Sequence, residues 1–422
     1  MAGLRSSALR VALAAGFTKP RAGRILTESH EMHGTSRPLP ARIQQARAQS
    51  TLGAALLIVW CSAAASCGGG AAPTSATPAP TSSAELTPVA ASADWPASTL
   101  GGEHLDPARL GDLVLRIRRG DYGRITSLVV ARRGRLVVEE YFNGWSAERP
   151  HTMQSVTKSV VSLLAGMAAG AGKLSVSDRA TRFFPAYEPL ANFDAGKAAM
   201  TVRDLLTMRT GLDWSEDPYA GSPLQRLNDC RCDWIRFVLD WRMREAPGTR
   251  WEYVSGGVIL AGGIIGAATG RRLDEFASAQ LFDPIGAAGA SWISGLPDGL
   301  PHGGGGLFLR PRDAAKLGQV VVDQGRWQGR QLVDAGWIAE STQPVVRGVR
   351  AWAGHAFDYG YLWWLTTDGG DEIVTASGAG GQWIFAIPRR QLVVVSTGDN
   401  NDGRAIAAVA FLFSHVLPAV ME

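Results

Sequence analysis

The stretch HTMQSVTKSVVSLLAGMAAG, residues 151–170, places a serine and a lysine three positions apart at the head of an apolar run. The run of valine, leucine and alanine predicts a buried helix. Residues i and i+3 share one helix face, so Lys158 is expected one turn from Ser155 and within reach of its hydroxyl. The motif therefore pairs a potential nucleophile with a potential base.

The apolar neighbours of Lys158 favour a chemical role, because desolvation penalises the ammonium and lowers a lysine pKa. A neutral lysine can accept the serine proton, and the helix N-terminus favours negative charge developing near Ser155. The alternative is a lysine at the start of an amphipathic helix that extends its charged head to water. Ser-x-x-Lys also occurs by chance, so the motif alone leaves both interpretations open.

Composition indicates a folded chain and does not favour a nucleic-acid partner. The 422 residues are 46% hydrophobic and 19% charged, enough for a large core. The chain has 42 Lys and Arg residues and 38 Asp and Glu residues. The first fifty residues contain eight of the basic residues and two of the acidic ones, so the remainder has 34 basic and 36 acidic residues. The basic excess thus belongs to the N-terminal segment, and no nucleic-acid partner is expected.

Residues 1–67 resemble an export signal. Arg42 and Arg47 precede an uncharged run from Ser50 to Ala65, which has the form of a secretory apolar region behind a positive one. The sequence AASC ends at Cys67 and is similar to a lipobox, in which the cysteine is lipidated; cleavage after Ala65 is the alternative. We expect an exported protein anchored by lipid to a membrane of the cell envelope, on the periplasmic or extracellular side.

Residues 68–95 are dominated by Gly, Ala, Pro, Ser and Thr, so they are interpreted as a tether before a domain of residues 96–422. Cys230 and Cys232 are separated by one residue, a spacing that suggests loop thiols rather than a disulfide or a zinc site. The chain lacks H-E-x-x-H, G-x-x-x-x-G-K-[ST] and G-x-S-x-G motifs. No metal and no cofactor are predicted.

Two hairpins are predicted near opposite ends of the domain. LVVARRGRLVVEEYF (128–142) and WIFAIPRRQLVVVST (383–397) each join two β-branched runs through a charged turn, and residues 405–417 read as a buried terminal helix. The chain between them is mainly helical. The predicted fold is α+β, an antiparallel sheet built from both ends with an inserted helical subdomain at about residues 166–300.

Two further segments complete a recognisable series. PGTRWEYVSGGVILAGGII (247–265) carries Tyr253 and Ser255 before an apolar helix, and TASGAGGQWIFAIP (375–388) places a glycine-rich strand before the last hairpin. With the Ser-x-x-Lys segment, this order and spacing resemble the serine β-lactamase and penicillin-binding-protein-like hydrolases, in their class C branch. The likeness covers about residues 102–417. Within that branch the chain most resembles the esterases and the 6-aminohexanoate-oligomer hydrolases, and the oligomer hydrolases have the same Tyr-x-Ser.

The resemblance implies a role for each matching residue. Ser155 would be the acylated nucleophile, Lys158 its activating base and Tyr253 the group that relays a proton to the leaving group. Which of Lys158 and Tyr253 takes the first proton stays open. Ser255 would bond within this cluster or cap its helix, and the backbone N–H groups of Ser155 and Ala379 would form the oxyanion hole. The implied activity is hydrolysis of a small-molecule ester or amide.

The chain departs from the β-lactamase pattern at the third strand. It has Ser377-Gly378-Ala379 where that pattern has K-T-G, and the missing lysine predicts neutral substrates. Two alternatives are a penicillin-interacting D-amino-acid peptidase or β-lactamase, and a non-catalytic envelope binding protein. The oligomeric state is left open. Residues expected to contact substrate are Tyr219, Ser377, Gly378 and Gly380.

One more segment has two interpretations. The sequence HGGGG from His302 imitates the oxyanion loop of lipases, but the matching nucleophile motif is absent. A glycine-rich crossing beneath the site is the favoured interpretation.

Overall fold

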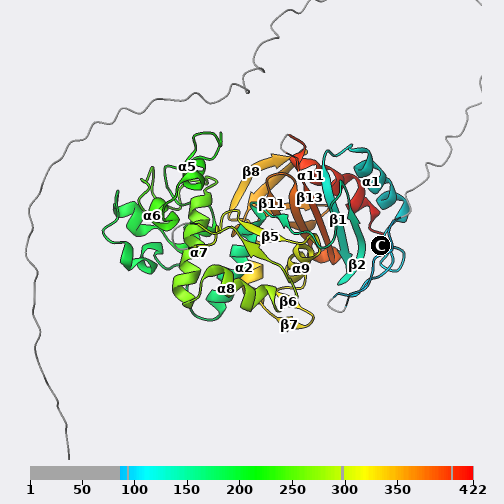
Figure 1. The fold of residues 1–422 in the computed structure, drawn as a ribbon, viewed down its shortest axis with the longest axis horizontal. Helices are drawn as coiled ribbons and strands as arrows, with labels where there is room; N and C mark the ends of the chain where they lie inside the picture. The colour runs from blue at the N-terminus through cyan, green and yellow to red at the C-terminus, as the bar shows by residue number, and fades with distance from the viewer. Residues whose placement is uncertain (1–85, 93–94, 296–298, 401–402, 422) are drawn as a thin grey trace, which may run out of the picture. The chain divides into compact units, whose positions relative to one another are not determined.

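The computed structural model describes residues 86–92, 95–295, 299–400 and 403–421 (Figure 1). The predicted export signal, Cys67 and most of the predicted tether lie outside these residues. The folded domain begins before the predicted boundary at residue 96. Leu86 and Val89 pack against the hydrophobic core, and the Thr87 N–H donates to the Glu140 carboxylate at 2.7 Å. The apolar area that these side chains bury explains the earlier start.

One eight-stranded sheet forms the centre of the domain. Its order is β2-β1-β13-β12-β11-β10-β9-β8, and each neighbouring pair is antiparallel. The strands come from the two ends of the domain, which confirms the predicted α+β fold. Their bounds are β1 Ile125–Arg132, β2 Arg135–Tyr141, β8 Val346–Trp352, β9 His355–Tyr359, β10 Trp364–Asp368, β11 Asp371–Gly378, β12 Gln382–Ile387 and β13 Leu392–Gly398.

Both predicted hairpins are present. β1 and β2 are joined by Arg133 and Gly134, whose φ values of 50° and 73° are of the kind that suits a two-residue turn between twisted strands. β12 and β13 are joined through the short helical turn Pro388–Arg390. The two hairpins meet where Val130 of β1 lies opposite Val394 of β13, which unites distant parts of the chain in one sheet.

Helical segments cover both faces of this sheet. On β12, a Cβ built on Gly318 of α9 (Pro311–Val322) would lie 3.0 Å from Ile384, so α9 approaches closely on that face. The adjacent Trp383 points to the other face, where its Nε1–H donates to the Ala405 carbonyl at 2.8 Å. The predicted terminal helix is confirmed there as α11 (Ala407–Phe411) with a wider turn over Leu412–Val416, against which α1 (Pro107–Arg119) packs.

The inserted segment is mainly helical, as predicted, and is the green part of Figure 1. Its helix α7 packs against α2, α4 and α6. The helices are α2 Val156–Gly170, α3 Ala195–Ala199, α4 Val202–Leu206, α5 Pro223–Asp229, α6 Trp234–Leu239, α7 Ser255–Thr269 and α8 Leu273–Ala277. No helix in the described ranges is long and apolar enough to cross a bilayer.

Short elements complete the domain and connect the sheet to the inserted segment. A three-stranded sheet has the order β3-β5-β4 and contains the strand that leads into α2. The remaining bounds are β3 His151–Thr152, β4 Ser291–Trp292, β5 Leu307–Leu309, β6 Arg326–Trp327, β7 Arg330–Gln331 and α10 Ala335–Ser341.

Candidate active site

Ser155 stands immediately before the first residue of α2. β3 pairs with β5, and Gln154 then adopts a left-handed conformation with φ of 47° before the helix begins at Val156. A positive φ outside glycine is costly, and such residues are concentrated at functional sites. The turn leaves Ser155 on the wall of a cavity while the helix behind it is buried.

Lys158 lies beside this serine, as the spacing predicts. Its Nζ is 2.8 Å from the Ser155 Oγ and also donates to the Gly304 carbonyl. Only 2% of Lys158 is exposed, so the interpretation as a lysine reaching toward water is wrong. Burial lowers the pKa of Lys158 to about 8, although the negative charge of Glu216 acts in the opposite direction. Near that pH a large fraction of the amine is neutral and can accept the serine proton.

Tyr253 joins the same cluster from the chain before α7. Its ring centroid lies 4.8 Å from the Lys158 Nζ, and Trp364 stacks on it at 5.8 Å between centroids. Burial raises the pKa of Tyr253, and a hydrogen bond with Ser155 lowers it in part. The phenol is therefore protonated at neutral pH and lies where it can pass a proton to or from the serine.

Ser255 has a partner that the sequence did not suggest. Its hydroxyl donates to the Glu216 carboxylate at 2.9 Å, and its backbone N–H donates to the same carboxylate. The Trp214 Nε1–H also donates to Glu216, at 2.8 Å. Ser255 is the first residue of α7, so it does not cap the helix, and Val254 occupies that position without a side-chain bond. Three donors thus hold a carboxylate near Lys158 and Tyr253.

The end of β11 forms the wall opposite the helix. A Cβ built on Gly378 would lie 2.4 Å from the Met153 carbonyl oxygen, so the backbone passes too close for a side chain. The next residue, Ala379, lines the same cavity as Ser155. The two residues therefore border one cavity, which an oxyanion hole built from their backbone N–H groups would require.

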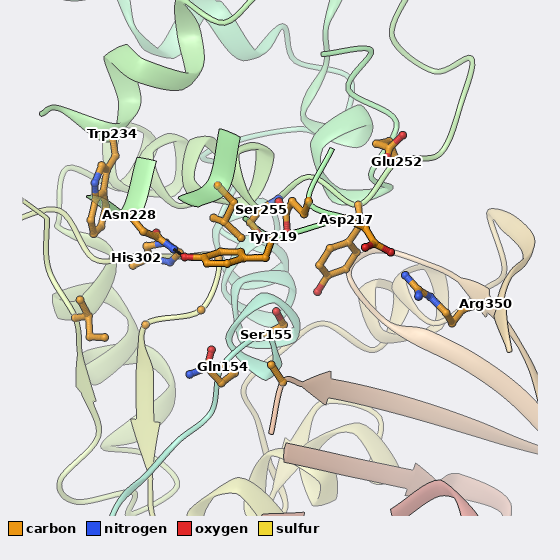
Figure 2. Close-up of a pocket in the computed structure, with 18 of the residues that line it drawn as sticks. Gln154, Ser155, Asp217, Tyr219, Asn228, Trp234, Glu252, Ser255, His302 and Arg350 are labelled. Atoms are coloured by element: carbon orange, nitrogen blue, oxygen red, sulfur yellow. Dashed lines mark hydrogen bonds between the residues drawn. The ribbon is translucent and has the colours of Figure 1, made fainter. Parts of the chain in front are cut away.

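The cavity has a volume of about 740 Å³, a size typical of small-molecule sites (Figure 2). Tyr219 lines it with half of its surface exposed, and its hydroxyl accepts from the Asn228 amide at 3.2 Å. Of the four predicted substrate contacts, Tyr219 alone lines the described cavity. Ser377, Gly378 and Gly380 are not among its lining residues, and at this end of the strand the cavity is bordered by Ala379.

The glycine run after His302 crosses beneath the site, as favoured from the sequence. Gly304 supplies the carbonyl that accepts from Lys158, and a Cβ built on Gly304 would lie 3.1 Å from the Ser255 carbonyl oxygen. The His302 Nε2 is 3.1 Å from the Asn228 Oδ1. Burial and the nearby charge of Lys158 lower the pKa of His302 to about 4, so this wall of the cavity is uncharged at neutral pH.

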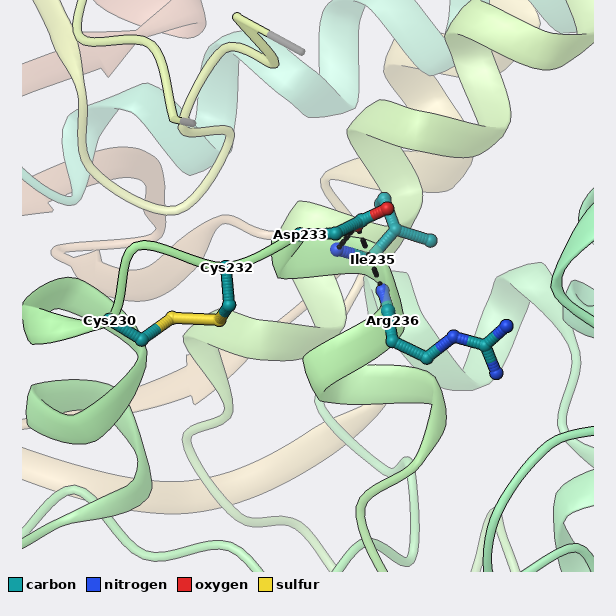
Figure 3. The surroundings of a disulfide bond; sticks show 5 residues. All are labelled: Cys230, Cys232, Asp233, Ile235 and Arg236. Atoms are coloured by element: carbon teal, nitrogen blue, oxygen red, sulfur yellow. Dashed lines mark hydrogen bonds between the residues drawn. A yellow bond between two sulfur atoms is a disulfide. The ribbon is translucent and has the colours of Figure 1, made fainter. Parts of the chain in front are cut away.

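Cys230 and Cys232 form a disulfide, so the prediction of loop thiols is wrong (Figure 3). Their Cα atoms are 5.3 Å apart, within the usual range of about 4.4 to 6.8 Å, because the chain turns between α5 and α6. The bridge follows Asn228 and precedes Trp234, which both line the cavity. Elsewhere in the described chain, no three His, Cys, Asp or Glu side chains are grouped as metal ligands would be.

The chain is similar to known proteins over most of its described length. Residues 121–410 match the family model described as Beta-lactamase. The chain is 25% identical over 306 residues to the 6-aminohexanoate-dimer hydrolase of Paenarthrobacter ureafaciens, an alignment that covers 68% of this chain and 75% of that protein.

Two solved structures share the fold. The octameric penicillin-binding protein homologue from Pyrococcus abyssi has a TM-score of 0.57 at 19% identity and covers 72% of this chain and 77% of its own. EstCE1, a hydrolase with promiscuous acyltransferase activity, has a TM-score of 0.59 at 18% identity. The alignment covers 72% of this chain and 98% of EstCE1. At sequence identities this low, the similarity to these two structures shows a shared fold and nothing about activity.

Proposed function

The chain belongs to the beta-lactamase family of hydrolases, and from that membership we propose that it cleaves an ester or amide through an acyl-enzyme on Ser155. One observation carries the proposal. The buried Lys158 amine lies 2.8 Å from the Ser155 hydroxyl, and its pKa is lowered to about 8. A base of this strength next to a serine is what nucleophilic catalysis near neutral pH needs.

In the proposed reaction, the Ser155 Oγ attacks the substrate carbonyl carbon while its proton passes to Lys158, directly or through Tyr253. The N–H groups of Ser155 and Ala379 donate to the oxyanion. The bond to the leaving group then breaks, and the leaving atom receives a proton through Tyr253. A water molecule next attacks the acyl carbon and gives its proton to the same base, which releases the acid and regenerates the serine.

A fluorophosphonate probe tests the nucleophile. We expect the wild type to be labelled and Ser155→Ala to be unlabelled, with kcat for a p-nitrophenyl ester lower by at least about 10⁴-fold. Ser162→Ala is the matched control, because this buried serine lies on the same helix and its hydroxyl has no hydrogen-bond partner there. Equal labelling of wild type and Ser155→Ala would place the nucleophile elsewhere.

The alternative activity, on penicillins or D-amino-acid peptides, is separated by substrate. Since Ser377 replaces the family lysine, p-nitrophenyl butyrate should be hydrolysed far faster than nitrocefin. Comparable efficiencies would favour the β-lactamase alternative. A non-catalytic binding protein would hydrolyse neither substrate, and the close grouping of Ser155, Lys158 and Tyr253 argues against that role.

We also propose that the protein is exported and anchored by lipid at Cys67, a proposal that rests on the sequence of the N-terminal segment. Cys67→Ala should move the protein from the membrane fraction to the soluble exported fraction. A mutant that stays with the membrane would indicate an uncleaved anchor instead.

A further inference from the structure

The Cys230–Cys232 disulfide lies between two segments that line the cavity beside Ser155. Cys230 directly follows α5, and α6 begins at Trp234, two residues after Cys232. Asn228 at the end of α5 and Trp234 at the start of α6 both line the cavity. Figure 3 shows the bridge in the turn that leads into α6. The disulfide therefore closes the connection between two parts of the cavity wall.

Hydrogen bonds do little to fix this turn. The Cys230 N–H donates to the Arg226 carbonyl at 3.1 Å, and the Asp233 carboxylate accepts from two N–H groups of α6. Between these positions, Arg231 and Cys232 make no backbone hydrogen bond within the described chain. A segment without such bonds opens readily, so the covalent bridge is the main constraint on the turn.

The residues on either side of the bridge meet at His302. The Asn228 side-chain oxygen lies 3.1 Å from the His302 Nε2, and the Asn228 amide donates to the Tyr219 hydroxyl at 3.2 Å. Trp234 packs edge-on against the same histidine, with 4.9 Å between ring centroids. The disulfide thus closes a ring of contacts that runs from α5 through His302 to α6.

The wall that contains this ring is uncharged and partly apolar. Its members are Leu224, Asn228, Trp234, Ile293 and His302. The His302 N–H donates to the Ile293 carbonyl at 2.9 Å, and 51% of Ile293 is exposed. Burial and the charge of Lys158 lower the pKa of His302 to about 4, so the ring is neutral at neutral pH. An apolar group of a ligand that covers this wall removes apolar surface from water.

This wall lies on the side of Ser155 that faces away from the leaving group. In Figure 2, Trp234 and His302 lie to one side of Ser155. Glu252 lies to the other side and directly precedes Tyr253, which is proposed to protonate the leaving atom. The acyl half of the substrate therefore extends toward the first side, and we call it the acyl-side wall.

The reacting groups are held independently of the turn between α5 and α6. Ser155 and Lys158 belong to the start of α2, and Lys158 also donates to the Gly304 carbonyl. The backbone around Gly304 is fixed by its own bonds, because the His302 carbonyl accepts from the Gly306 N–H at 3.0 Å. Opening the disulfide should therefore loosen the acyl-side wall and leave the base in place.

We infer that the Cys230–Cys232 disulfide determines which acyl groups the protein accepts, because it fixes the acyl-side wall. With the bridge closed, esters and amides of long apolar acids bind along this wall, and with the bridge open they bind less well. An acetyl group has a single methyl beyond the reacting carbonyl, so it places little on the wall and reacts as before. This inference rests on the proposed function, since the role of Tyr253 there sets the direction of the acyl half.

A dithiol opens the bridge by thiol–disulfide exchange. One thiolate of the dithiol attacks a sulfur of the bridge, and the second thiol then displaces the mixed disulfide. The dithiol loses two electrons and two protons and becomes a disulfide, while the S–S bond breaks and Cys230 and Cys232 become thiols. Both cysteines are partly exposed, which this attack requires.

Reduction of the wild-type protein tests the inference. p-Nitrophenyl octanoate and p-nitrophenyl acetate share a leaving group and differ only in the length of the acyl chain. The full chain is treated with dithiothreitol and desalted without air, because free thiols cleave these esters. kcat/KM for the octanoate should fall by about fivefold or more, and kcat/KM for the acetate should stay within about twofold. Alkylation of the peptide that carries both cysteines verifies the reduction.

Reoxidation and a matched variant complete the experiment. Oxidised glutathione should close the bridge again and restore the octanoate efficiency, which a damaged protein would not do. The double variant Cys230→Ser/Cys232→Ser should show the low octanoate-to-acetate ratio without reduction and should not respond to dithiothreitol. If the variant does not fold in a thermal melt, the reduced and reoxidised wild type decide. If the bridge resists dithiothreitol, the variant decides.

An unaltered ratio after complete reduction would overturn the inference. Equal losses with both esters would also overturn it, as would a wild type that does not cleave the octanoate. If fluorophosphonate labels wild-type Ser155, these failures concern the inference alone. If Ser155 is unlabelled and neither ester is cleaved, the proposed function fails as well.

Discussion

Helices α2 and α9 each bury a lysine against the sheet, and the residue three positions earlier differs. Lys158 follows Ser155, with 2.8 Å between Nζ and Oγ, whereas Lys316 follows Asp313, with 3.1 Å between Nζ and Oδ1. Both lysines are almost fully buried. The same spacing thus supports an amine–hydroxyl pair in one helix and an ion pair in the other.

The difference shows that burial of a lysine does not by itself indicate function. In α9 the Asp313 carboxylate compensates the buried ammonium, and Arg310 binds the same carboxylate at 2.7 Å. In α2 the neighbouring group is a neutral hydroxyl, so burial lowers the pKa of Lys158 to about 8. A buried cation with a carboxylate partner is a structural element, whereas one without such a partner is a candidate base.

Of these two buried lysines, Lys158 should give the larger effect on catalysis when it is replaced. Lys158→Met keeps a long apolar side chain in apolar surroundings, so the fold should persist while kcat for p-nitrophenyl butyrate falls by about 10³-fold or more. Initial rates and a thermal melt measured together separate these outcomes. A variant that retains a tenth of the activity would show that Lys158 is not the base.

The matched change in α9 should affect stability and leave catalysis intact. Lys316→Met leaves Asp313 without one of its cations, so the free energy of unfolding should fall by about 3 kcal/mol. Because Lys316 does not line the cavity, kcat should stay within about twofold of the wild type. Denaturant unfolding gives the first quantity. A stabilised variant would mean that the buried pair is dispensable.

The pH dependence should follow Lys158. The neutral amine is the active form, so kcat/KM should rise about tenfold per pH unit below about pH 8 and level off above it. A pH–rate profile on a neutral ester, restricted to the range where the protein stays folded, measures this. A flat profile between about pH 6 and 9 would contradict the assignment.

The smallest effect concerns Glu216, the carboxylate near Lys158. Its negative charge raises the pKa of Lys158, so Glu216→Gln should move the midpoint of the profile to lower pH. The glutamine amide oxygen can still accept from Ser255, which keeps the local structure comparable. A midpoint that moves to higher pH would show that the variant changes the site by another route.

Much of the site was predictable because its elements are local. The i, i+3 rule places Ser155 beside Lys158 once the apolar run forms a helix, and the structure agrees. The roles of Tyr253 and Ala379 came from the resemblance of their segments to a known family, and both line the cavity with Ser155. The hairpins were also predictable, because β-branched runs and turn residues are recognised within a few neighbouring positions.

Long-range groupings were not predictable in this way. The sequence pointed to Tyr219 and not to Glu216, which lies three residues before it. The hydrogen bond between Glu216 and Ser255 joins residues 39 positions apart. The Cys230–Cys232 disulfide depends on a turn that the one-residue spacing does not reveal. In each case the packing of separate segments decides which residues become partners. The periodic pattern of apolar residues along the chain does not indicate these pairs.

The sequence by itself determined the sheet built from two hairpins, the buried helix and the pairing of Ser155 with Lys158, because each follows from contacts within a few residues. Tertiary structure decided the rest. It brought Glu216 to Ser255 and turned Arg350 of β8 toward a cavity whose nucleophile lies almost two hundred residues earlier. Charge acts through space rather than along the chain, so the electrostatics of the site are set only when the segments have packed.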